Sequence, residues 1–305
     1  MAKRWIPETL FDELDFRMTY AAEQVLYEMQ TEHQHLVLFE HKFFGKVLML
    51  DGATQVTSRD EFIYHEMMTH VPIFAHGRAR EVLIVGGGDC GIAEEVLKHN
   101  SIKRLTQVEI DASVIEFSKQ HFPEFTGPVF ADRRFELVID DGMRYVGCTE
   151  RRFDVIIVDS TDPQGPGKVL FSDAFYRACR ARLHQGGVMV TQNGVPMLQS
   201  GELTASIRRF CKLFTDGYCY VAAIPTYVGG HMAMGWAADD AKLRATPLRT
   251  IADRYRRAGR FATKYWTPEV HVAAFALPRF IAEQAEKAMR APRPPRRSRR
   301  VAQGA

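Results

Sequence analysis

The stretch VLIVGGGDCGIAEEVLK, residues 82–98, decides the fold of this chain. Its first four residues are apolar and predict a buried strand, a glycine-rich turn follows, and residues 92–98 have the composition of a helix. Glycines in such a turn let the backbone approach a ligand, and the helix presents free N–H groups there. The turn also fits G-x-G-x-x-G, the dinucleotide-binding pattern, but glycine turns are common in all doubly wound folds. This stretch therefore predicts a nucleotide-type site without identifying its ligand.

Short apolar runs continue after this turn and alternate with segments of helical length. The runs are 82–85, 105–108, 135–139, 155–158, 188–191, 220–224 and 232–236. Nearly continuous apolar strands that are spaced by helices predict a mostly parallel sheet with both faces covered. We therefore predict a Rossmann-like α/β domain over residues 79–286.

The first 78 residues have a different pattern. Alternating runs at 24–27, 35–39 and 46–50 are separated by turn residues such as Gly45 and Gly52. They predict β-hairpins, and hence a small N-terminal β domain over residues 1–78. A linking segment, residues 60–70, has helical spacing, and we expect that helix to end before Pro72.

The formal charge of +3 is distributed unevenly. Residues 287–305 contain seven basic residues and no acidic one, which leaves 33 basic against 37 acidic residues in the remainder. This tail has few residues that a core could bury, so we expect it to be disordered. Binding of nucleic acid through the tail is one interpretation, and a solvated tail without a specific partner is the favoured one.

The composition is that of a soluble globular protein, with 46% hydrophobic and 25% charged residues. No run approaches the roughly 18 apolar residues of a membrane span, and the N-terminus lacks the apolar segment of a signal peptide. The five cysteines form no C-x-x-C pair, which favours reduced thiols over disulfides or a zinc site. We therefore expect a cytoplasmic protein.

Two carboxylates indicate what the glycine turn binds. Glu109 ends the second predicted strand, where a carboxylate can accept hydrogen bonds from the ribose hydroxyls of an adenosine-type ligand. Asp89 lies inside the turn, where it would repel the pyrophosphate of NAD and the carboxylate of S-adenosylmethionine. It would attract a ligand whose tail ends in an ammonium group. The alternative, that Asp89 only caps the following helix, stays open.

Five acidic residues lie in this turn or at the ends of predicted strands. Ligands of open α/β sheets bind beyond these strand ends, where carboxylates that share a crevice repel one another and need a cation to offset the repulsion. A metal is disfavoured because no histidine lies near these strand ends, so a polycationic ligand is favoured over scattered helix caps. The five are Asp89, Glu109, Asp141, Asp159 and Asp162.

Several longer motifs resemble those of the spermidine synthases, also called polyamine aminopropyltransferases. They are LDGATQVTSRDEFIYHEMMTHVP (50–72), VLIVGGGDCGIAEEVLKH (82–99), VEIDASVIEF (108–117), VIDDGM (138–143), FDVIIVDSTDPQGPG (153–167), TQNGVP (191–196), IPTYVGGHMAMGWA (224–237) and VHVAAFALP (270–278). The resemblance covers residues 5 to 280. It implies a methyltransferase-like α/β domain with a β-rich N-terminal domain, assembled as a homodimer or homotetramer.

The resemblance also implies roles for individual residues. Glu109 would bind the ribose, Asp141 the adenine amino group, and Asp159 would accept a proton from the acceptor amine, assisted by Tyr227. The implied donor site comprises Gln34, Gly86, Gly88, Asp89, Glu109, Asp141, Gly142 and Pro166. The implied polyamine site comprises Tyr64, His65, Asp89, Asp159, Ser160, Thr161, Asp162, Gln192 and Tyr227.

Two positions depart from the family. Cys90 replaces the glycine that usually occupies this place in the turn, and Glu95 stands where an arginine is common. A side chain is poorly suited to positive φ, so we expect the turn to be slightly reshaped around the aminopropyl group.

Together these features predict transfer of an aminopropyl group from decarboxylated S-adenosylmethionine to putrescine, with no cofactor and no metal. The alternatives are another polyamine acceptor, a methyltransferase, an NAD dehydrogenase, or a non-catalytic nucleic-acid-binding protein. The acids at 89 and 159–162 argue against a methyltransferase, whose site would need neither.

Overall fold

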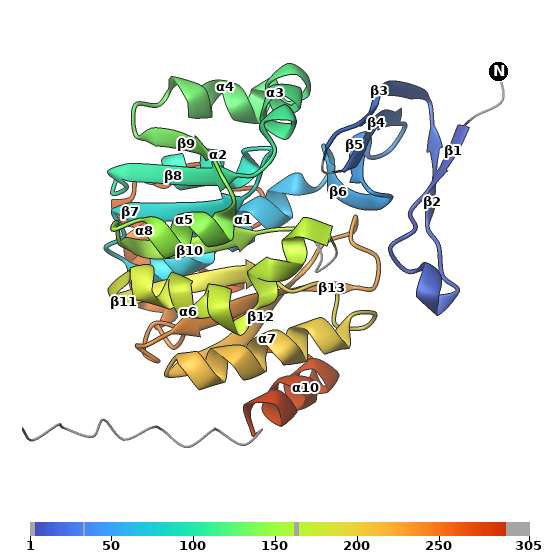
Figure 1. The fold of residues 1–305 in the computed structure, drawn as a ribbon. Coiled ribbons are helices and arrows are strands. Elements are labelled where there is room, and N and C mark those ends of the chain that lie inside the picture. The colour runs from blue at the N-terminus through green and yellow to red at the C-terminus, as the bar shows by residue number, and fades with distance from the viewer. Residues whose placement is uncertain (1–3, 33, 162–164, 291–305) are drawn as a thin grey trace, which may run out of the picture.

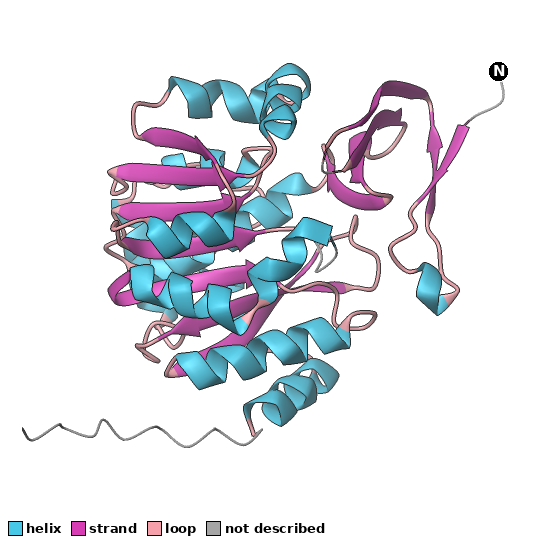
Figure 2. Ribbon diagram, in the orientation of Figure 1, coloured by secondary structure: helices cyan, strands magenta, loops and turns pink. Residues whose placement is uncertain are grey.

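The computed structural model describes residues 4–32, 34–161 and 165–290. Within these residues the chain forms a two-stranded, a four-stranded and a seven-stranded sheet (Figure 1). Figure 2 shows that helices cover both faces of the largest sheet, while the two small sheets lie together at one side of it. The N-terminal strands therefore stand beside the α/β part, at the ends of its central strands.

The large sheet consists of β7 (Glu81–Gly86), β8 (Arg104–Glu109), β9 (Phe135–Ile139), β10 (Phe153–Asp159), β11 (Leu183–Gln192), β12 (Asp216–Ala223) and β13 (His231–Ala238). Its order is β12-β13-β11-β10-β7-β8-β9. Strands β9, β8, β7, β10 and β11 are parallel, whereas β13 is antiparallel to both β11 and β12. The seven apolar runs of the sequence correspond to these strands, and the prediction of a mostly parallel sheet is confirmed.

Two hydrophobic cores flank this sheet. One face is covered by α1 (Glu61–His76), α2 (Gly91–Leu97), α8 (Leu248–Arg257) and α9 (Pro268–Ala273), and the other by α5 (Gly142–Cys148), α6 (Asp173–Arg182) and α7 (Ser200–Leu213). In β10, Val155 and Ile157 enter the first core, whereas Ile156 and Val158 enter the second. Successive strand residues point to opposite faces, so a doubly covered strand must be apolar throughout.

The N-terminal part is antiparallel. It consists of β1 (Arg4–Pro7), β2 (Thr19–Ala22), β3 (Gln24–Gln30), β4 (His35–His41), β5 (Gly45–Leu50) and β6 (Ala53–Thr57), with a 3₁₀ turn at Asp12–Leu14. Phe39 and Val47 of the four-stranded sheet pack toward β1 and β2. Leu36 and Leu48 face the other way and pack with Phe117 and its neighbours in α3 (Ala112–His121) and α4 (Pro123–Ala131). The predicted β-hairpins are present, and α3 and α4 hold them against the large domain.

Helix α1 contradicts one prediction, because it continues through Pro72 to His76. Proline removes the N–H that the carbonyl of Met68 would accept. The helix is buried from Ile63 to Ala75 between the sheet and α2, and this packing outweighs the lost hydrogen bond. The helix ends instead at Gly77, whose φ of 75° forms a left-handed C-cap.

The glycine turn keeps its left-handed geometry with a cysteine in it. Gly86, Gly87 and Cys90 have φ values of 87°, 69° and 66°. A Cβ on Gly86 would lie 1.9 Å from the carbonyl oxygen of Asp159, so only glycine fits there. At Cys90 the left-handed conformation costs roughly 1–2 kcal/mol, and burial of the fully enclosed side chain offsets part of that cost. The cysteine therefore adopts the conformation expected of glycine.

None of the helices in the described part of the chain is both long and apolar enough to cross a lipid bilayer. Helix α10 (Arg279–Met289) packs on α7 through Ile281 and Ala285. Residues 287–289, the beginning of the segment expected to be disordered, are thus helical. The remainder of the tail after residue 290 lies outside the described residues.

Candidate active site

A cavity of about 410 Å³ lies beyond the carboxyl ends of β7, β8 and β10, and residues of β5 and β6 form its opposite wall. This is the place where open α/β sheets bind ligands. Of the residues that the sequence singled out, the cavity is lined by Gln34, Tyr64, His65, Gly86, Gly88, Asp89, Glu109, Asp141, Gly142, Asp159, Ser160, Thr161, Gln192 and Tyr227. Asp162 and the side chain of Pro166 lie outside the described part of the chain.

Asp159 is the last residue of β10 and is paired with Tyr64 of α1. The Tyr64 hydroxyl donates a hydrogen bond of 2.6 Å to Asp159 Oδ1. Burial and the charge of Asp89 raise the pKa of Asp159 to about 6, although the bond from Tyr64 opposes this. Burial and the charge of Asp159 raise the pKa of Tyr64 well above its usual value, so the phenol stays protonated. Asp159 is thus an oriented carboxylate whose proton affinity suits a general base.

His65, the next residue of α1, lies between two carboxylates. Its Nε2 is 3.2 Å from Asp89 Oδ2, and its Nδ1 is 2.9 Å from Glu61 Oε2. Ionised carboxylates only accept hydrogen bonds, so both ring nitrogens must donate and the ring carries a positive charge. Burial lowers the pKa of His65, but the charges and hydrogen bonds of Asp89 and Glu61 outweigh burial and raise it well above its usual value.

Asp89 combines both interpretations that the sequence left open. Its Oδ1 accepts the amide hydrogen of Gly91 at 2.9 Å, at the start of α2, while Oδ2 faces His65. Burial raises the pKa of Asp89, and the charge of His65 more than reverses this, so its pKa lies below the usual value. Glu61, His65 and Asp89 together carry one net negative charge. The group therefore remains attractive to a cation.

Glu109 is the last residue of β8 and lies beside the backbone of the glycine turn. Its Oε1 accepts the amide hydrogen of Asp111 at 3.0 Å, and burial raises its pKa to about 7. A Cβ on Gly88 would lie 3.2 Å from Glu109 Oε2 and 2.5 Å from Val114 Cγ1. Only glycine lets the turn approach this closely. A carboxylate in this position can accept hydrogen bonds from vicinal hydroxyl groups.

Some acids at the strand ends are helix caps. Asp141 accepts the amide hydrogen of Arg144 at 2.7 Å at the start of α5, and Asp111 accepts that of Ser113 at 2.9 Å at the start of α3. Capping occupies one carboxylate oxygen. Asp141 also lines the cavity, so capping and ligand binding are compatible there.

Tyr227 lies in the loop between β12 and β13, across the cavity from β10. Its hydroxyl donates to the backbone oxygen of Gln55 in β6 at 2.6 Å, and its ring meets the Tyr64 ring edge-on at 5.9 Å. The loop is anchored because Asp60 Oδ2 accepts the amide hydrogen of Thr226 at 2.8 Å. The family resemblance implied that Tyr227 would assist Asp159. In the structure, the hydroxyl group that donates a hydrogen bond to Asp159 belongs to Tyr64.

Polar side chains from other strand ends complete the lining. Gln192 ends β11 and is 9% exposed. Gln34 precedes β4, and its backbone N–H donates to Thr31 Oγ1 at 3.0 Å. Ser160 Oγ is buried and has no hydrogen-bond partner among the residues that the structure describes. Such an atom is available to a ligand, because buried hydroxyl groups are normally paired.

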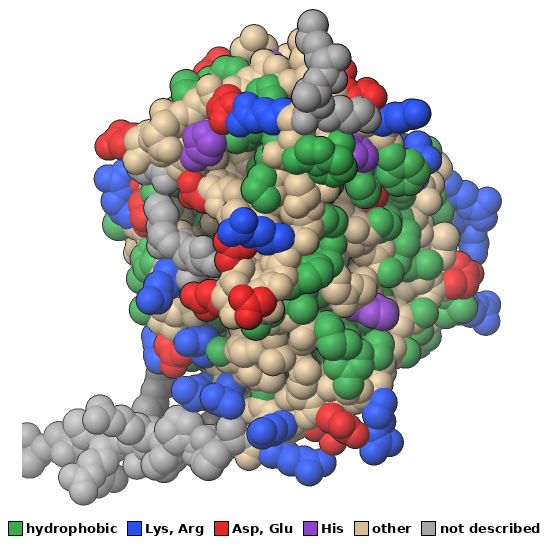
Figure 3. Space-filling view, turned by 90° about the vertical axis from the view of Figure 1, so that its right-hand side faces the viewer, with side chains coloured by type: hydrophobic (Ala, Val, Ile, Leu, Met, Phe, Trp, Pro, Cys, Tyr) green, Lys and Arg blue, Asp and Glu red, His purple; other side chains and the backbone are tan. Residues whose placement is uncertain are grey.

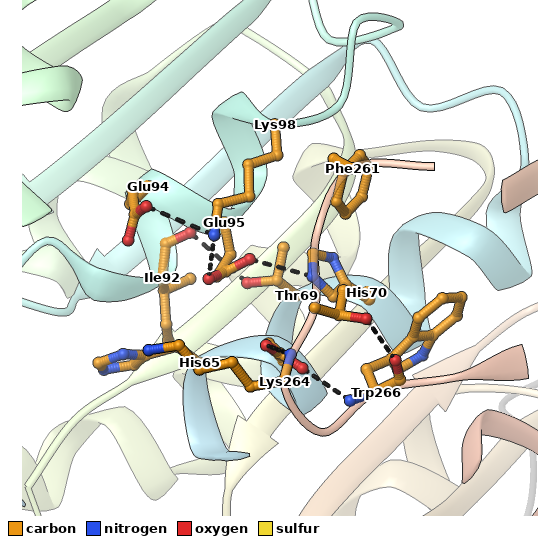
Figure 4. Close-up of polar contacts among 12 residues, drawn as sticks. His65, Thr69, His70, Ile92, Glu94, Glu95, Lys98, Phe261, Lys264 and Trp266 are labelled. Atoms are coloured by element: carbon orange, nitrogen blue, oxygen red, sulfur yellow. Dashed lines mark hydrogen bonds and ion pairs between the residues drawn. The ribbon is translucent and has the colours of Figure 1, made fainter. Parts of the chain in front are cut away.

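A second polar network joins α1 to α2 behind the cavity, and the sequence did not indicate it. Glu95 Oε1 lies 2.6 Å from Lys98 Nζ, and Glu95 Oε2 lies 3.1 Å from His70 Nε2 (Figure 4). Burial lowers the pKa of His70 well below its usual value. The His70 ring is therefore neutral, unlike the ring of His65. Glu61 was missed as well, although its spacing of one helical turn from His65 is a usable signal.

The comparisons with known proteins cover both parts of the chain. Residues 61–246 match the spermine/spermidine synthase domain, and residues 5–58 match the spermidine synthase tetramerisation domain. Polyamine aminopropyltransferase 1 of Pseudomonas aeruginosa is 51% identical over 276 residues, which are 90% of this chain and 96% of that protein. The polyamine aminopropyltransferase of a Ruegeria species is 52% identical over 277 residues, 91% of this chain and 96% of that protein.

Two solved structures match nearly the whole chain. A spermidine synthase in complex with the transition-state analogue AdoDATO has a TM-score of 0.87 at 35% identity, over 93% of this chain and 95% of that one. The spermidine synthase of Thermotoga maritima has a TM-score of 0.86 at 34% identity, over 94% and 96%. The fold, the acidic cavity and these matches agree, and the chain belongs to the spermidine synthase family of polyamine aminopropyltransferases.

Proposed function

We propose that the chain transfers the aminopropyl group of decarboxylated S-adenosylmethionine to putrescine, giving spermidine and 5′-methylthioadenosine. The observation that carries this proposal is the gathering of Asp89, Glu109, Asp141 and Asp159 around one cavity. The donor has a sulfonium and an ammonium group, and the acceptor is a diamine, so every reacting partner is a cation. Carboxylates in a partly buried cleft attract such ligands several-fold more strongly than carboxylates in water.

The donor would lie along the ends of β7 and β8. Glu109 would accept hydrogen bonds from the ribose hydroxyl groups, and Asp141 would accept one from the adenine amino group. Asp89 would pair with the terminal ammonium group. The bare backbone of the turn would let the ligand approach closely. Gln34, Gly86, Gly88, Gly142 and Pro166 would complete this half of the site.

The acceptor would lie beside Asp159. An alkyl diamine is almost wholly protonated at neutral pH, so one amine must lose a proton before it can react. Asp159 would accept that proton, and the nitrogen lone pair would then attack the aminopropyl carbon bonded to sulfur. The new C–N bond forms as the C–S bond breaks, and its electron pair stays on sulfur as the thioether of 5′-methylthioadenosine. Holding both cations in line contributes more of the acceleration than the proton transfer does.

Tyr64 would set the direction of the base, since it holds Asp159 Oδ1 and leaves Oδ2 for the amine. His65, Ser160, Thr161, Gln192 and Tyr227 would surround the rest of the diamine. Asp162 would bind the distal ammonium and thereby select the length of the acceptor.

The acceptor is tested with the purified protein, decarboxylated S-adenosylmethionine, and putrescine, cadaverine, agmatine or spermidine at equal concentrations. We expect spermidine from putrescine as the product with the highest kcat/KM, with one 5′-methylthioadenosine per amine formed. A higher kcat/KM for another amine would contradict the proposed acceptor. Methylation of amines by S-adenosylmethionine, without aminopropyl transfer, would contradict the whole proposal.

Binding of 5′-methylthioadenosine should strengthen as the pH rises, because Glu109 has a pKa of about 7. Its ionised form, which accepts hydrogen bonds from both ribose hydroxyls, predominates only above that pH. We expect affinity to rise by up to about tenfold between about pH 6 and about pH 8. Glu109→Gln should bind more weakly and with no such dependence in calorimetric titrations, and an unchanged pH dependence in this variant would exclude Glu109 as its source.

The match of residues 5–58 to a tetramerisation domain supports a homo-oligomer, and we propose a homodimer or homotetramer. Figure 3 shows hydrophobic side chains exposed on the face that carries the N-terminal strands. Trp5 in β1 is 64% exposed. Trp5→Asp should shift the protein toward smaller species in sedimentation velocity, because a buried, unpaired carboxylate is costly at an interface. Val272→Asp, at an exposed apolar residue of α9, is the matched control and should leave the assembly unchanged.

A further inference from the structure

Gln107 is a fully buried amide directly beneath the glycine turn. It lies in β8, two residues before Glu109, and none of its surface is exposed. Its Nε2 donates to the carbonyl oxygens of Gly86 at 3.1 Å and Gly87 at 2.6 Å. Two carbonyl acceptors require the NH₂ end of the amide to face them, which settles the orientation of the side chain. One side chain thus holds the carbonyl groups of two consecutive residues of the turn, both of which have positive φ.

Gly87 is the residue at which this turn meets the strand of the proposed base. Its amide donates to the carbonyl oxygen of Asp159 at 3.0 Å, and its carbonyl also accepts the amide hydrogen of Cys90 at 2.9 Å. The backbone that carries Asp159 and the backbone that carries Asp89 therefore meet at Gly87. Gln107 holds the carbonyl oxygens of the two peptide groups that flank Gly87, those of Gly86 and Gly87.

Cys90 completes the arrangement from the other end of the turn. Its thiol is enclosed, and burial, followed by the charges of Asp89 and Glu109, raises its pKa to about 12, so it remains an S–H donor. The thiol donates toward the carbonyl oxygen of Gly88, at a distance of 3.9 Å. Gln107 Oε1 is buried and has no hydrogen-bond partner among the described residues, so the amide acts on the turn through its Nε2.

We propose that Gln107 is a positioning residue for aminopropyl transfer, which sets the separation of Asp89 from Asp159 by holding the backbone at Gly86 and Gly87. The inference rests on the proposed function. Asp89 would hold the ammonium end of the aminopropyl chain, and Asp159 the amine that attacks its other end. A shift of the turn would thus misalign the aminopropyl chain more than the adenosine half of the site, whose ribose and adenine contacts come from Glu109 and Asp141.

The test compares Gln107→Leu with the parent enzyme. Leucine keeps most of the buried volume but removes both donors from the turn. We expect kcat/KM for decarboxylated S-adenosylmethionine to fall by about tenfold or more, while the Kd of 5′-methylthioadenosine changes by less than about twofold. Hydrogen exchange of the amides of residues 86–91 should also become faster, which is a readout independent of activity.

Tyr176→Phe is the matched control, because it removes a buried hydrogen bond to Ser206 Oγ between α6 and α7, away from the cavity lining. It should lower the melting temperature without changing donor kinetics or exchange in the turn. Proportional losses of donor kcat/KM and 5′-methylthioadenosine affinity in Gln107→Leu would overturn the proposal, as would unchanged donor kinetics. If the parent enzyme transferred no aminopropyl group, the proposed function would fail instead, a result distinct from either of these.

Gln107→Glu provides a second readout in case the leucine variant folds poorly. A carboxylic acid can donate one hydrogen bond to the turn only while it is protonated, and a carboxylate there would repel both carbonyl oxygens and Asp89. The ratio of variant to parent kcat/KM should therefore rise as the pH is lowered. A ratio that does not depend on pH would contradict a role of the amide hydrogens.

Discussion

Asp159→Asn is expected to lower turnover by about 100-fold or more, since removal of a general base typically costs this much. The amide keeps the size of the side chain and can still accept the hydrogen bond from Tyr64. It cannot take a proton from the acceptor amine, which then has no lone pair to offer. Single-turnover kinetics with saturating donor and putrescine measure the chemical step directly.

Two controls separate chemistry from binding in this variant. The Kd of 5′-methylthioadenosine should stay within about twofold of the parent value, because the adenosine half depends on Glu109 and Asp141. Tyr64→Phe should have a smaller effect, about tenfold, because it removes the orienting hydroxyl and leaves the base in place. Near-normal turnover of Asp159→Asn would show that the proton leaves by another route.

Asp89→Asn is expected to weaken binding of the decarboxylated donor by on the order of 10- to 100-fold. The change removes the carboxylate that would pair with the aminopropyl ammonium. It also leaves His65 with only Glu61 as a carboxylate partner, so a positive ring would face the incoming ammonium. Isothermal titration against an unreactive analogue of the donor gives the affinity without turnover.

The control ligand for Asp89→Asn is 5′-methylthioadenosine, which has no ammonium group. Its affinity should change by about threefold at most, because Asp89 Oδ1 only holds the start of α2 and asparagine can accept the same hydrogen bond. Equal losses for the two ligands would mean that the substitution damages the turn, and the charge argument would then fail.

The strands were predictable because their burial leaves a direct trace in the sequence. A strand covered on both faces must be apolar throughout, and residues 155–158 of β10 and 82–85 of β7 fulfil this without exception. The end of α1 was not predictable in the same way. Pro72 is a local signal against a helix, and only the tertiary burial of the helix overrides it.

The acids of the site were predictable because strand ends converge. Asp89, Glu109 and Asp159 all follow apolar runs, so the topology of the sheet brings them together. Their partners Tyr64 and His65 were named only through the family resemblance, since they reach the cavity because α1 packs across the sheet. Gln107 left no signal either, because an interior polar residue in a strand has many possible partners until the strands are placed.

The central claim is that the charges of this cavity select a cationic donor. Donor discrimination by the unmodified protein tests this claim most directly. The measurement is the Kd of decarboxylated S-adenosylmethionine and of S-adenosylmethionine itself, taken by titration in the same buffer without an acceptor amine. The two ligands differ only in a carboxylate that would lie near Asp89. The account predicts that the decarboxylated form binds at least about tenfold more tightly. Equal affinities, or tighter binding of S-adenosylmethionine, would contradict it.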